Sequence, residues 1–420
     1  MGLSGSQGRF PLLDGVRALA ATFVFLFHGW YFLGMEEGRA LSGTVNEIGV
    51  QATRDLSTIA SHLGEIGVAL FYLLSAFLLY RPFAKHALAD GRPVELKAYF
   101  VRRLARIVPA YWLVITVVGI ADPQTNVFSI DGLLNLYLFL GIWNPEGIVR
   151  ASNPFIATWT VQVEMTFYLF LPVWAGLMAW VRRRGRDALR TELWGLAVLA
   201  GVGIAWKLVA VGQISGEAWF GSSFAVLPAS IDVFAVGMAL AIASVLGGSR
   251  WSVILGRIGG RSLACWTGAA ATYLLLCWVG DPRGPFGGTT AANALGSNFL
   301  KIPVALLILL PAIRASGGSD AIARFLGWRA VAWIGTVSYG VYLWHVWVLR
   351  HLGGTWIGGG NGPFNTTVVQ MIVPEMIAAY AITLMIAAAS WYLLEQRTLA
   401  AGHRLSKRIE TRGATGSTAA

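Results

Sequence analysis

The feature that most constrains this chain is a series of ten apolar runs, each long enough to cross a bilayer as a helix. A transmembrane helix needs about 20 mostly apolar residues. Lipid offers no hydrogen-bonding partners, so only helices or closed barrels can span it. The runs therefore predict an all-α polytopic membrane bundle of about ten transmembrane helices. They cover residues 12–34, 64–81, 101–120, 156–181, 192–212, 224–246, 262–280, 295–315, 334–350 and 367–394.

Composition excludes the main soluble alternatives. Of the 420 residues, 56% are hydrophobic and only 13% are charged, whereas soluble chains carry about 25% charged residues. A cytosolic globular enzyme, a disordered protein and a disulfide-stapled secreted domain are therefore excluded. The formal charge of +11 is interpreted as basic cytoplasmic loops rather than a nucleic-acid surface. The expected partner is the lipid bilayer, with no nucleic acid.

The distribution of basic residues predicts how the helices are oriented. Cytoplasmic loops carry an excess of Lys and Arg. With ten spans and a cytoplasmic N-terminus, three quarters of the 32 Lys and Arg residues fall in cytoplasmic loops. If the short apolar stretch 131–143 also crossed, the basic run at 182–190 would change sides and the rule would fail. We therefore expect both termini in the cytoplasm and a re-entrant or interfacial segment at 131–143.

The chain is expected to form one integral membrane domain, residues 1–400, followed by a disordered cytoplasmic tail, residues 401–420. The tail mixes charged residues with Gly, Ser, Thr and Ala, a composition that favours disorder. No internal repeat is apparent, so symmetry gives no support to an inverted-repeat transporter.

Ionisable residues inside a span are costly and are candidate functional groups. The first run carries Asp14, Arg17 and His28. Asp14 and Arg17 are three residues apart and can pair on one helical face. Arg17 and His28 are eleven residues apart, which places them on a common face about 16 Å apart along the axis. The alternative for His28 is a hydrogen-bonded core histidine without a catalytic role.

Glu164 in the fourth run is expected at a depth similar to that of His28. A carboxylate beside an imidazole raises its basicity, so the two could form an orienting pair. The alternative is two unrelated polar groups, each satisfied by backbone or water. Sequence alone does not show that these two helices touch.

Two further groups stand out. Arg103 and Arg106 lie on one helical face at the cytoplasmic interface, where guanidinium groups would suit a phosphate-rich ligand; the positive-inside rule also predicts basic residues there. Ser338 and His345 are seven residues apart, about 10 Å along a helix, too far for a nucleophile–base pair. No metal site is predicted, because no HExxH or paired-cysteine motif occurs.

Together these segments resemble the membrane acyltransferase 3 family, multi-spanning O-acyltransferases of bacterial envelopes and antibiotic pathways. The resemblance extends from about Phe10 to Glu395. Departures include Ala76 in place of a usual Gly, and Met165 in place of a frequent second Glu. The matching motifs are Arg17-x10-His28, Gly67 to Leu78, Arg103-x-x-Arg106 to Pro109, Trp159 to Tyr168 with Glu164, Ser338-Tyr339 to His345, and Leu394-Glu395.

The resemblance implies transfer of an acyl group, often acetyl, from an acyl-CoA co-substrate to a hydroxyl of a sugar, glycolipid, cell-envelope glycan or macrolide-type metabolite. It implies no permanently bound cofactor and a place in the bacterial cytoplasmic membrane. His28 would be the general base, Glu164 its orienting partner, and Arg17, Arg103 and Arg106 the donor-binding residues. Candidate substrate-positioning residues are Asp14, Ser75, Tyr168, Ser338, Tyr339 and His345.

Two alternatives remain open. A transporter or flippase could use the buried Arg and His as a substrate or proton relay. A non-catalytic envelope scaffold is the other, although buried charges would then be an unnecessary cost.

Overall fold

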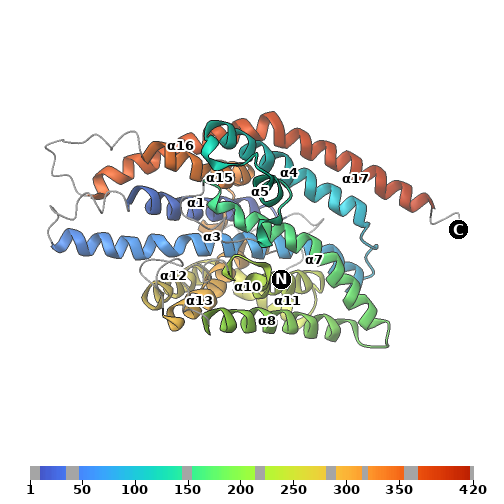
Figure 1. Cartoon of the computed structure of the whole chain (residues 1–420). Helices are drawn as coiled ribbons and strands as arrows, with labels where there is room; N and C mark the ends of the chain where they lie inside the picture. Colours follow the sequence, from blue (N-terminus) through green and yellow to red (C-terminus); the bar gives the residue numbers. More distant parts are fainter. Residues whose placement is uncertain are drawn as a thin grey trace.

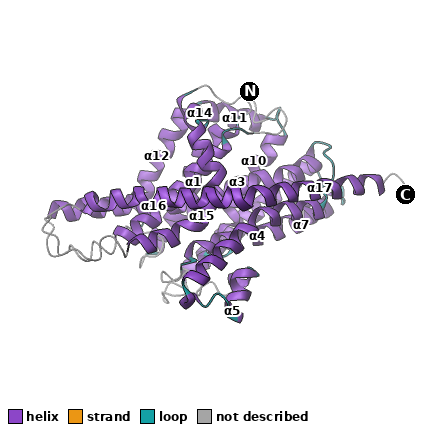
Figure 2. Cartoon of the chain, turned by 90° about the horizontal axis from the view of Figure 1, so that it is seen from above, coloured by secondary structure: helices purple, strands orange, loops and turns teal. Residues whose placement is uncertain are grey.

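The computed structural model describes residues 10–34, 47–143, 154–212, 223–280, 290–314, 320–353 and 368–416. Within these ranges the chain is helical and contains no strand, which confirms the all-α prediction (Figure 2). Several of the long helices run along a common direction (Figure 1), and the helices pack into one bundle.

The described chain contains longer and shorter helices. The longer ones are α1 (Leu13–Gly29), α3 (Glu47–Leu88), α4 (Leu96–Ala121), α7 (Trp159–Arg182), α8 (Ala188–Gly212), α10 (Leu227–Val245), α11 (Arg250–Gly260), α12 (Ser262–Val279), α13 (Ala291–Leu309), α15 (Arg329–Gly353), α16 (Val368–Ser390) and α17 (Gln396–Gly416). The shorter ones are η2 (Trp30–Gly34), η3 (Pro123–Thr125), α5 (Ile130–Gly132), η4 (Leu133–Tyr137), η5 (Leu140–Trp143), η6 (Ile156–Thr158), η8 (Leu310–Ile313), α14 (Ala321–Leu326) and η9 (Trp391–Glu395).

Eight helical segments of the described chain are long and apolar enough to cross a membrane. They coincide with eight of the ten predicted spans. The other two predicted spans, 12–34 and 334–350, lie in α1–η2 and in α15. These two helices pack on each other, and α1 also packs on α3 while α15 packs on α16. Because neighbouring helices surround them, they can carry polar residues that a lipid-facing helix could not.

Small residues allow the central helices to approach closely. A Cβ atom added at Gly67 of α3 would lie 2.5 Å from the carbonyl oxygen of Ala20 in α1. One added at Gly335 of α15 would lie 1.8 Å from the carbonyl oxygen of Asp14. Helix association in lipid depends on such backbone proximity. The contacts bring α1 against both α3 and α15, and so assemble the walls of the site described below.

The segment 131–143 forms short helical turns, α5, η4 and η5, rather than one long helix. Trp112 of α4 donates from its indole nitrogen to the carbonyl of Tyr137 at 3.0 Å. The Tyr137 hydroxyl lies 2.7 Å from that of Thr116. These contacts attach the segment to the side of α4.

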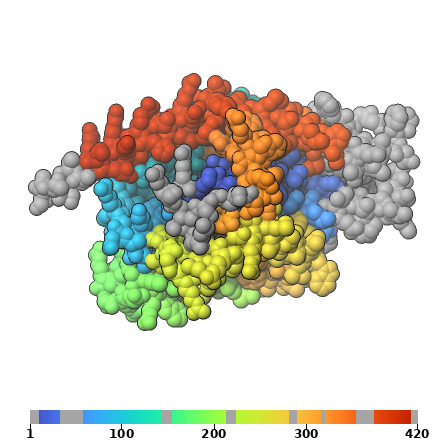
Figure 3. Space-filling view, turned by 180° about the vertical axis from the view of Figure 1, so that it is seen from behind, coloured from blue at the N-terminus to red at the C-terminus, as the bar shows by residue number. Residues whose placement is uncertain are grey.

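The end of the chain corrects the sequence-based expectation. Residues after Ala401, predicted to be disordered, are helical as far as Gly416 in α17. The helix packs along α4, where Gly402 faces Ala105 and Arg102 pairs with Glu410 at 2.5 Å. Composition misled because most of the helix surface is polar and exposed, and among residues 396–412 only Gly402 and Ser406 are buried. Together α16, η9 and α17 form a continuous ridge along one face (Figure 3).

Candidate functional site

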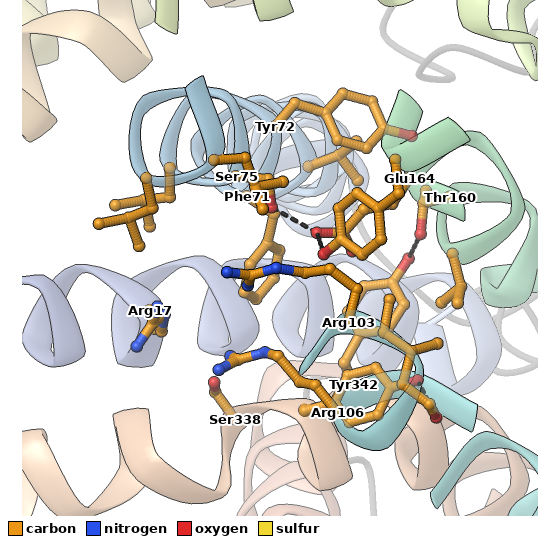
Figure 4. Close-up of a pocket in the computed structure, with 18 residues that line it drawn as sticks. Arg17, Phe71, Tyr72, Ser75, Arg103, Arg106, Thr160, Glu164, Ser338 and Tyr342 are labelled. Atoms are coloured by element: carbon orange, nitrogen blue, oxygen red, sulfur yellow. Dashed lines mark hydrogen bonds between the residues drawn. The ribbon is translucent and has the colours of Figure 1, made fainter. Parts of the chain in front are cut away.

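A cavity with polar and apolar side chains in its wall opens between α1, α3, α4, α7 and α15 (Figure 4). It has an empty volume of about 810 Å³, its mouth included. Most of the polar residues singled out in the sequence contribute to its wall. The lining residues are Arg17, Val68, Phe71, Tyr72, Leu74, Ser75, Leu78, Leu79, Arg103, Arg106, Ile107, Thr160, Val161, Glu164, Tyr168, Ser338, Tyr339 and Tyr342.

The Glu164 carboxylate accepts hydrogen bonds from two hydroxyl groups at the cavity wall. Oε1 of Glu164 accepts hydrogen bonds from Ser75 of α3 and, at 2.6 Å, from Tyr168 one turn further along α7. The Ser75 contact is drawn as a dashed line in Figure 4. The carbonyl of Tyr168 also accepts from the Tyr99 hydroxyl of α4 at 3.2 Å. This network ties α3, α4 and α7 together around the cavity.

Three guanidinium groups face the same space. Arg17 comes from α1, and Arg103 and Arg106 come from successive turns of α4 (Figure 4). Arg17 donates from Nη1 to Asp14 at 2.7 Å, the pairing that the sequence spacing predicted. In the described part of the chain neither Arg103 nor Arg106 forms an ion pair, and the buried Nε of Arg103 lacks a hydrogen-bonding partner. Buried donors without partners mark a place where a ligand can bind.

A second cavity adjoins the first and has an empty volume of about 550 Å³. Arg17, Arg106 and Tyr339 line both cavities and so form the boundary between them. The Tyr339 hydroxyl donates to the carbonyl of Ile107 at 3.0 Å, which fixes α15 against α4 at this level. The remaining lining residues are Asp14, Gly335, Thr336, Trp391, Glu395 and Leu399.

His28 lies near the other end of α1, just before the π-helical turn η2, a kind of turn frequent at functional sites. The residue is 8% exposed, and its ring packs edge-on against Phe27. Nδ1 of His28 lies 3.0 Å from the carbonyl oxygen of Val24 and 3.1 Å from Nε2 of His345. The two predicted histidines are therefore direct neighbours, which the sequence did not indicate.

An aromatic wall separates the histidine pair from the polar cavity. Tyr342 lines the cavity, and its ring centroid lies 5.7 Å from that of His345 and 5.7 Å from that of Phe71. The Tyr342 hydroxyl is held by the Thr160 hydroxyl and by the carbonyl of Ala157 at 2.8 Å. Neither histidine lines either cavity.

The expected pairing of His28 with Glu164 is wrong. Glu164 bonds to Ser75 and Tyr168, whereas His28 contacts Val24 and His345. Residue counting places a group along its own helix, but it does not determine how far a neighbouring helix is shifted along the axis. That shift puts Glu164 on the cavity side of Tyr342.

The structure brings eight of the predicted site residues to the first cavity, with Asp14 at the second. Those eight are Arg17, Ser75, Arg103, Arg106, Glu164, Tyr168, Ser338 and Tyr339. Sequence reasoning did not single out Phe71, Tyr72 or Tyr342. The position of Tyr342, three residues before His345 on one helical face, was the available signal.

Comparison with known proteins points to one family. A family model described as an acyltransferase domain matches residues 10–394. Nodulation protein 10 of Rhizobium leguminosarum bv. viciae is 27% identical over 96% of this chain and 97% of its own length. The peptidoglycan O-acetyltransferase OatA of Listeria monocytogenes is 24% identical over 71% of this chain, but only 48% of its own length. The acyltransferase MdmB of Streptomyces mycarofaciens is 28% identical over 40% of each chain. No solved structure matches significantly.

Proposed function

The chain belongs to the membrane acyltransferase 3 family, and from this premise we propose that it transfers an acyl group, acetyl in the first instance, from acyl-CoA to a hydroxyl. The proposed acceptor is a sugar, glycolipid, cell-envelope glycan or macrolide-type metabolite. The names of the relatives support this range, since they include a peptidoglycan O-acetyltransferase and a nodulation protein. The nodulation protein is also the relative that this chain matches over nearly its full length.

The observation that carries the proposal is the set of three guanidinium groups around one cavity with a single carboxylate. Among the described residues only Arg17 of the three has an ion-pair partner, Asp14, and an unpaired charge in a membrane bundle is costly unless an anion neutralises it. Coenzyme A carries a phosphate and a diphosphate, and guanidinium groups bind phosphate oxygens in paired hydrogen bonds. Arg17, Arg103 and Arg106 would hold these phosphates.

The proposed base is His28. It lies about 16 Å along α1 from Arg17, a span comparable to an extended phosphopantetheine arm. Phosphates held at the arginines would therefore place the thioester near His28. The arm would have to pass Phe71 and Tyr342, whose rings would rotate to let it through.

In the proposed reaction Nε2 of His28 takes the hydroxyl proton of the acceptor as its oxygen bonds to the acyl carbon. The carbon–sulfur bond then breaks, and the departing thiolate receives the proton from the imidazolium. Glu164 would not contact His28 in this scheme. Its carboxylate would instead hold Ser75 and Tyr168 at the cavity wall and offset part of the arginine charge.

The proposed topology has ten spans, the eight apolar helices together with α1 and α15, in the bacterial cytoplasmic membrane. Both termini would lie in the cytoplasm. The basic residues of the predicted cytoplasmic loops support this orientation. The arginine cavity would then lie in the cytoplasmic half, where acyl-CoA is available, with His28 nearer the outer face.

The test compares a deletion strain with strains that produce the natural chain or His28→Ala. Mass spectrometry of envelope lipids, glycans and metabolites should reveal an ester-linked mass that is missing after deletion. The natural chain should restore it, and His28→Ala should not, at equal protein levels in the membrane. Full restoration by His28→Ala would exclude His28 as the base. Unchanged masses with altered solute uptake would favour a transporter.

A further inference from the structure

The contact between the two histidines determines where their protons can be. Nδ1 of His345 lies 2.7 Å from the carbonyl oxygen of Tyr342. A carbonyl oxygen only accepts, so this nitrogen must carry a proton and donate it. In a neutral imidazole the other nitrogen then has a free lone pair. That nitrogen, Nε2 of His345, faces Nδ1 of His28 at 3.1 Å.

The same argument applies to His28. Its Nδ1 is flanked by two acceptors, the carbonyl oxygen of Val24 at 3.0 Å and the lone pair of His345. It must therefore carry the ring proton. Nε2 of His28 is left as the unprotonated nitrogen, and it has no hydrogen-bonding partner among the residues that the structure describes.

We propose that His345 is a positioning residue that, together with the Val24 carbonyl, holds His28 in one tautomer and keeps its Nε2 lone pair available to the acceptor hydroxyl. This inference rests on the proposed role of His28 as the base. The single Nδ1–H of His28 is shared between the Val24 carbonyl and Nε2 of His345, and Nδ1–H of His345 donates to the Tyr342 carbonyl, so the hydrogen bonds run in one direction. His345 replaces Glu164 in the orienting role that the sequence suggested.

A neutral His345 is a suitable neighbour for His28 during the proposed proton transfer. When His28 becomes an imidazolium, its Nδ1–H still faces two acceptors, so its charged form is stabilised without a second proton transfer. Two adjacent histidines cannot both be charged at low cost inside the bundle, so the pair carries one extra proton at most. An ionised carboxylate in this position would carry a desolvation cost that its contacts would have to offset.

His345 itself has no access to substrate in this structure. It is 1% exposed, and the rings of Phe25, at 6.5 Å between centroids, and Tyr342 enclose it. Its effect must therefore pass through His28. A wrong tautomer of His28 would direct its N–H, not its lone pair, toward the hydroxyl and would block proton abstraction.

The first experiment measures incorporation of labelled acetyl from acetyl-CoA into ester-bound material of deletion-strain membranes that contain each variant. His345→Phe should lower kcat by roughly 10- to 100-fold, less than the loss of an ionised triad carboxylate, with KM for acetyl-CoA unchanged. His345→Gln should recover part of the loss, because its amide oxygen can accept from His28. His351→Gln is the matched control, since exposed His351 lies on the same helix and also contacts a backbone carbonyl, that of Trp347, at 2.8 Å.

A second measurement does not depend on activity. Nitrogen-15 spectra of histidine-labelled full-length protein distinguish a protonated from an unprotonated ring nitrogen, and His28→Gln identifies the His28 signals. We expect a protonated Nδ1 and an unprotonated Nε2 in the natural protein, and a partial shift toward the other tautomer in His345→Gln, because the Gln amide can either accept from Nδ1 of His28 or donate to it. This measurement also decides the question if His345→Phe fails to accumulate.

The outcomes separate this inference from the proposed function. Full kcat in His345→Phe, or a protonated Nε2 of His28 in the natural protein, would overturn the positioning role and leave the function intact. Equal kcat losses in His345→Phe and His345→Gln would likewise overturn it. Full activity of His28→Ala would remove the base itself, and with it the premise.

Discussion

Two polar regions inside the bundle differ in whether their charged side chains have ion-pair partners. Around the cavity, Arg103 and Arg106 face empty space without an ionic partner in the described chain. On the other side, Lys207 of α8 and Asp232 of α10 are 0% and 5% exposed and pair at 2.5 Å. Nζ of Lys207 also lies 5.3 Å from the Phe299 ring centroid. Neither member of this pair lines a described cavity.

The region around the Lys207–Asp232 pair is tightly packed. The side-chain Oδ1 of Asp232 accepts from the backbone of Val233 at 3.0 Å, and a Cβ added at Gly203 would lie 3.0 Å from Asp232. Nearby, His62 contacts Glu65 at 2.9 Å. The comparison teaches that an intramembrane charge is by itself no sign of a binding site. A charge that lacks a partner and faces a void is the more informative signal.

The largest expected effect is a loss of stability when the Lys207–Asp232 ion pair is broken. Lys207→Met leaves the Asp232 carboxylate buried and unpaired, which should destabilise the protein by about 3–5 kcal/mol. Thermal unfolding of the detergent-solubilised protein should show a large drop in Tm. The double variant Lys207→Met, Asp232→Leu should recover most of it. A Lys207→Met protein with normal Tm but impaired acyl transfer would place the pair in the functional machinery.

The second-largest effect is expected on donor binding at the cavity, with stability unchanged. Arg103→Ala removes charge-assisted hydrogen bonds to the donor, each worth about 1.5–3 kcal/mol. We therefore expect KM for acetyl-CoA to rise by roughly 10- to 100-fold, with Tm within a degree or two of the natural protein. Arg257→Ala, in α11 outside both cavities, is the control for charge loss. An unchanged KM would argue against phosphate binding at Arg103.

A smaller effect is expected from the hydroxyl groups around Glu164. Tyr168→Phe removes one of two hydrogen bonds to the carboxylate, worth about 1 kcal/mol, and should lower kcat/KM about fivefold. Combined with Ser75→Ala, the loss should exceed the sum of the two free-energy changes, because Glu164 is then left without either donor. Additive losses would show that the two hydroxyls act independently.

The smallest effect is expected at the surface. Glu410→Gln removes the ion pair with Arg102, whose side chains are 27% and 45% exposed. Such pairs contribute about 0–1 kcal/mol, so both Tm and acyl transfer should be nearly unchanged. A marked loss of transfer with normal Tm would show that α17 takes part in donor binding.

The sequence predicted the helices better than the contacts between them. Apolar runs follow from residue chemistry alone, and eight of them coincide with apolar spans of the structure. The stretch 131–143 was correctly separated from these spans, because it is too short. The prediction of disorder after Ala401 was wrong because it also relied on composition alone. Its polar composition concealed a helix that is held by tertiary contact with α4.

The amino-acid sequence by itself determined that this chain is a membrane-embedded helical acyltransferase, and which ionisable residues interrupt its apolar runs. Both follow from hydropathy and motif, which are local properties. Only the tertiary structure decided which of those residues meet: Arg17 with Arg103 and Arg106 around a cavity, Glu164 with Ser75, and His28 with His345. The physical reason is that contacts between helices depend on their relative shift and rotation, and these are set by side-chain packing over the whole interface.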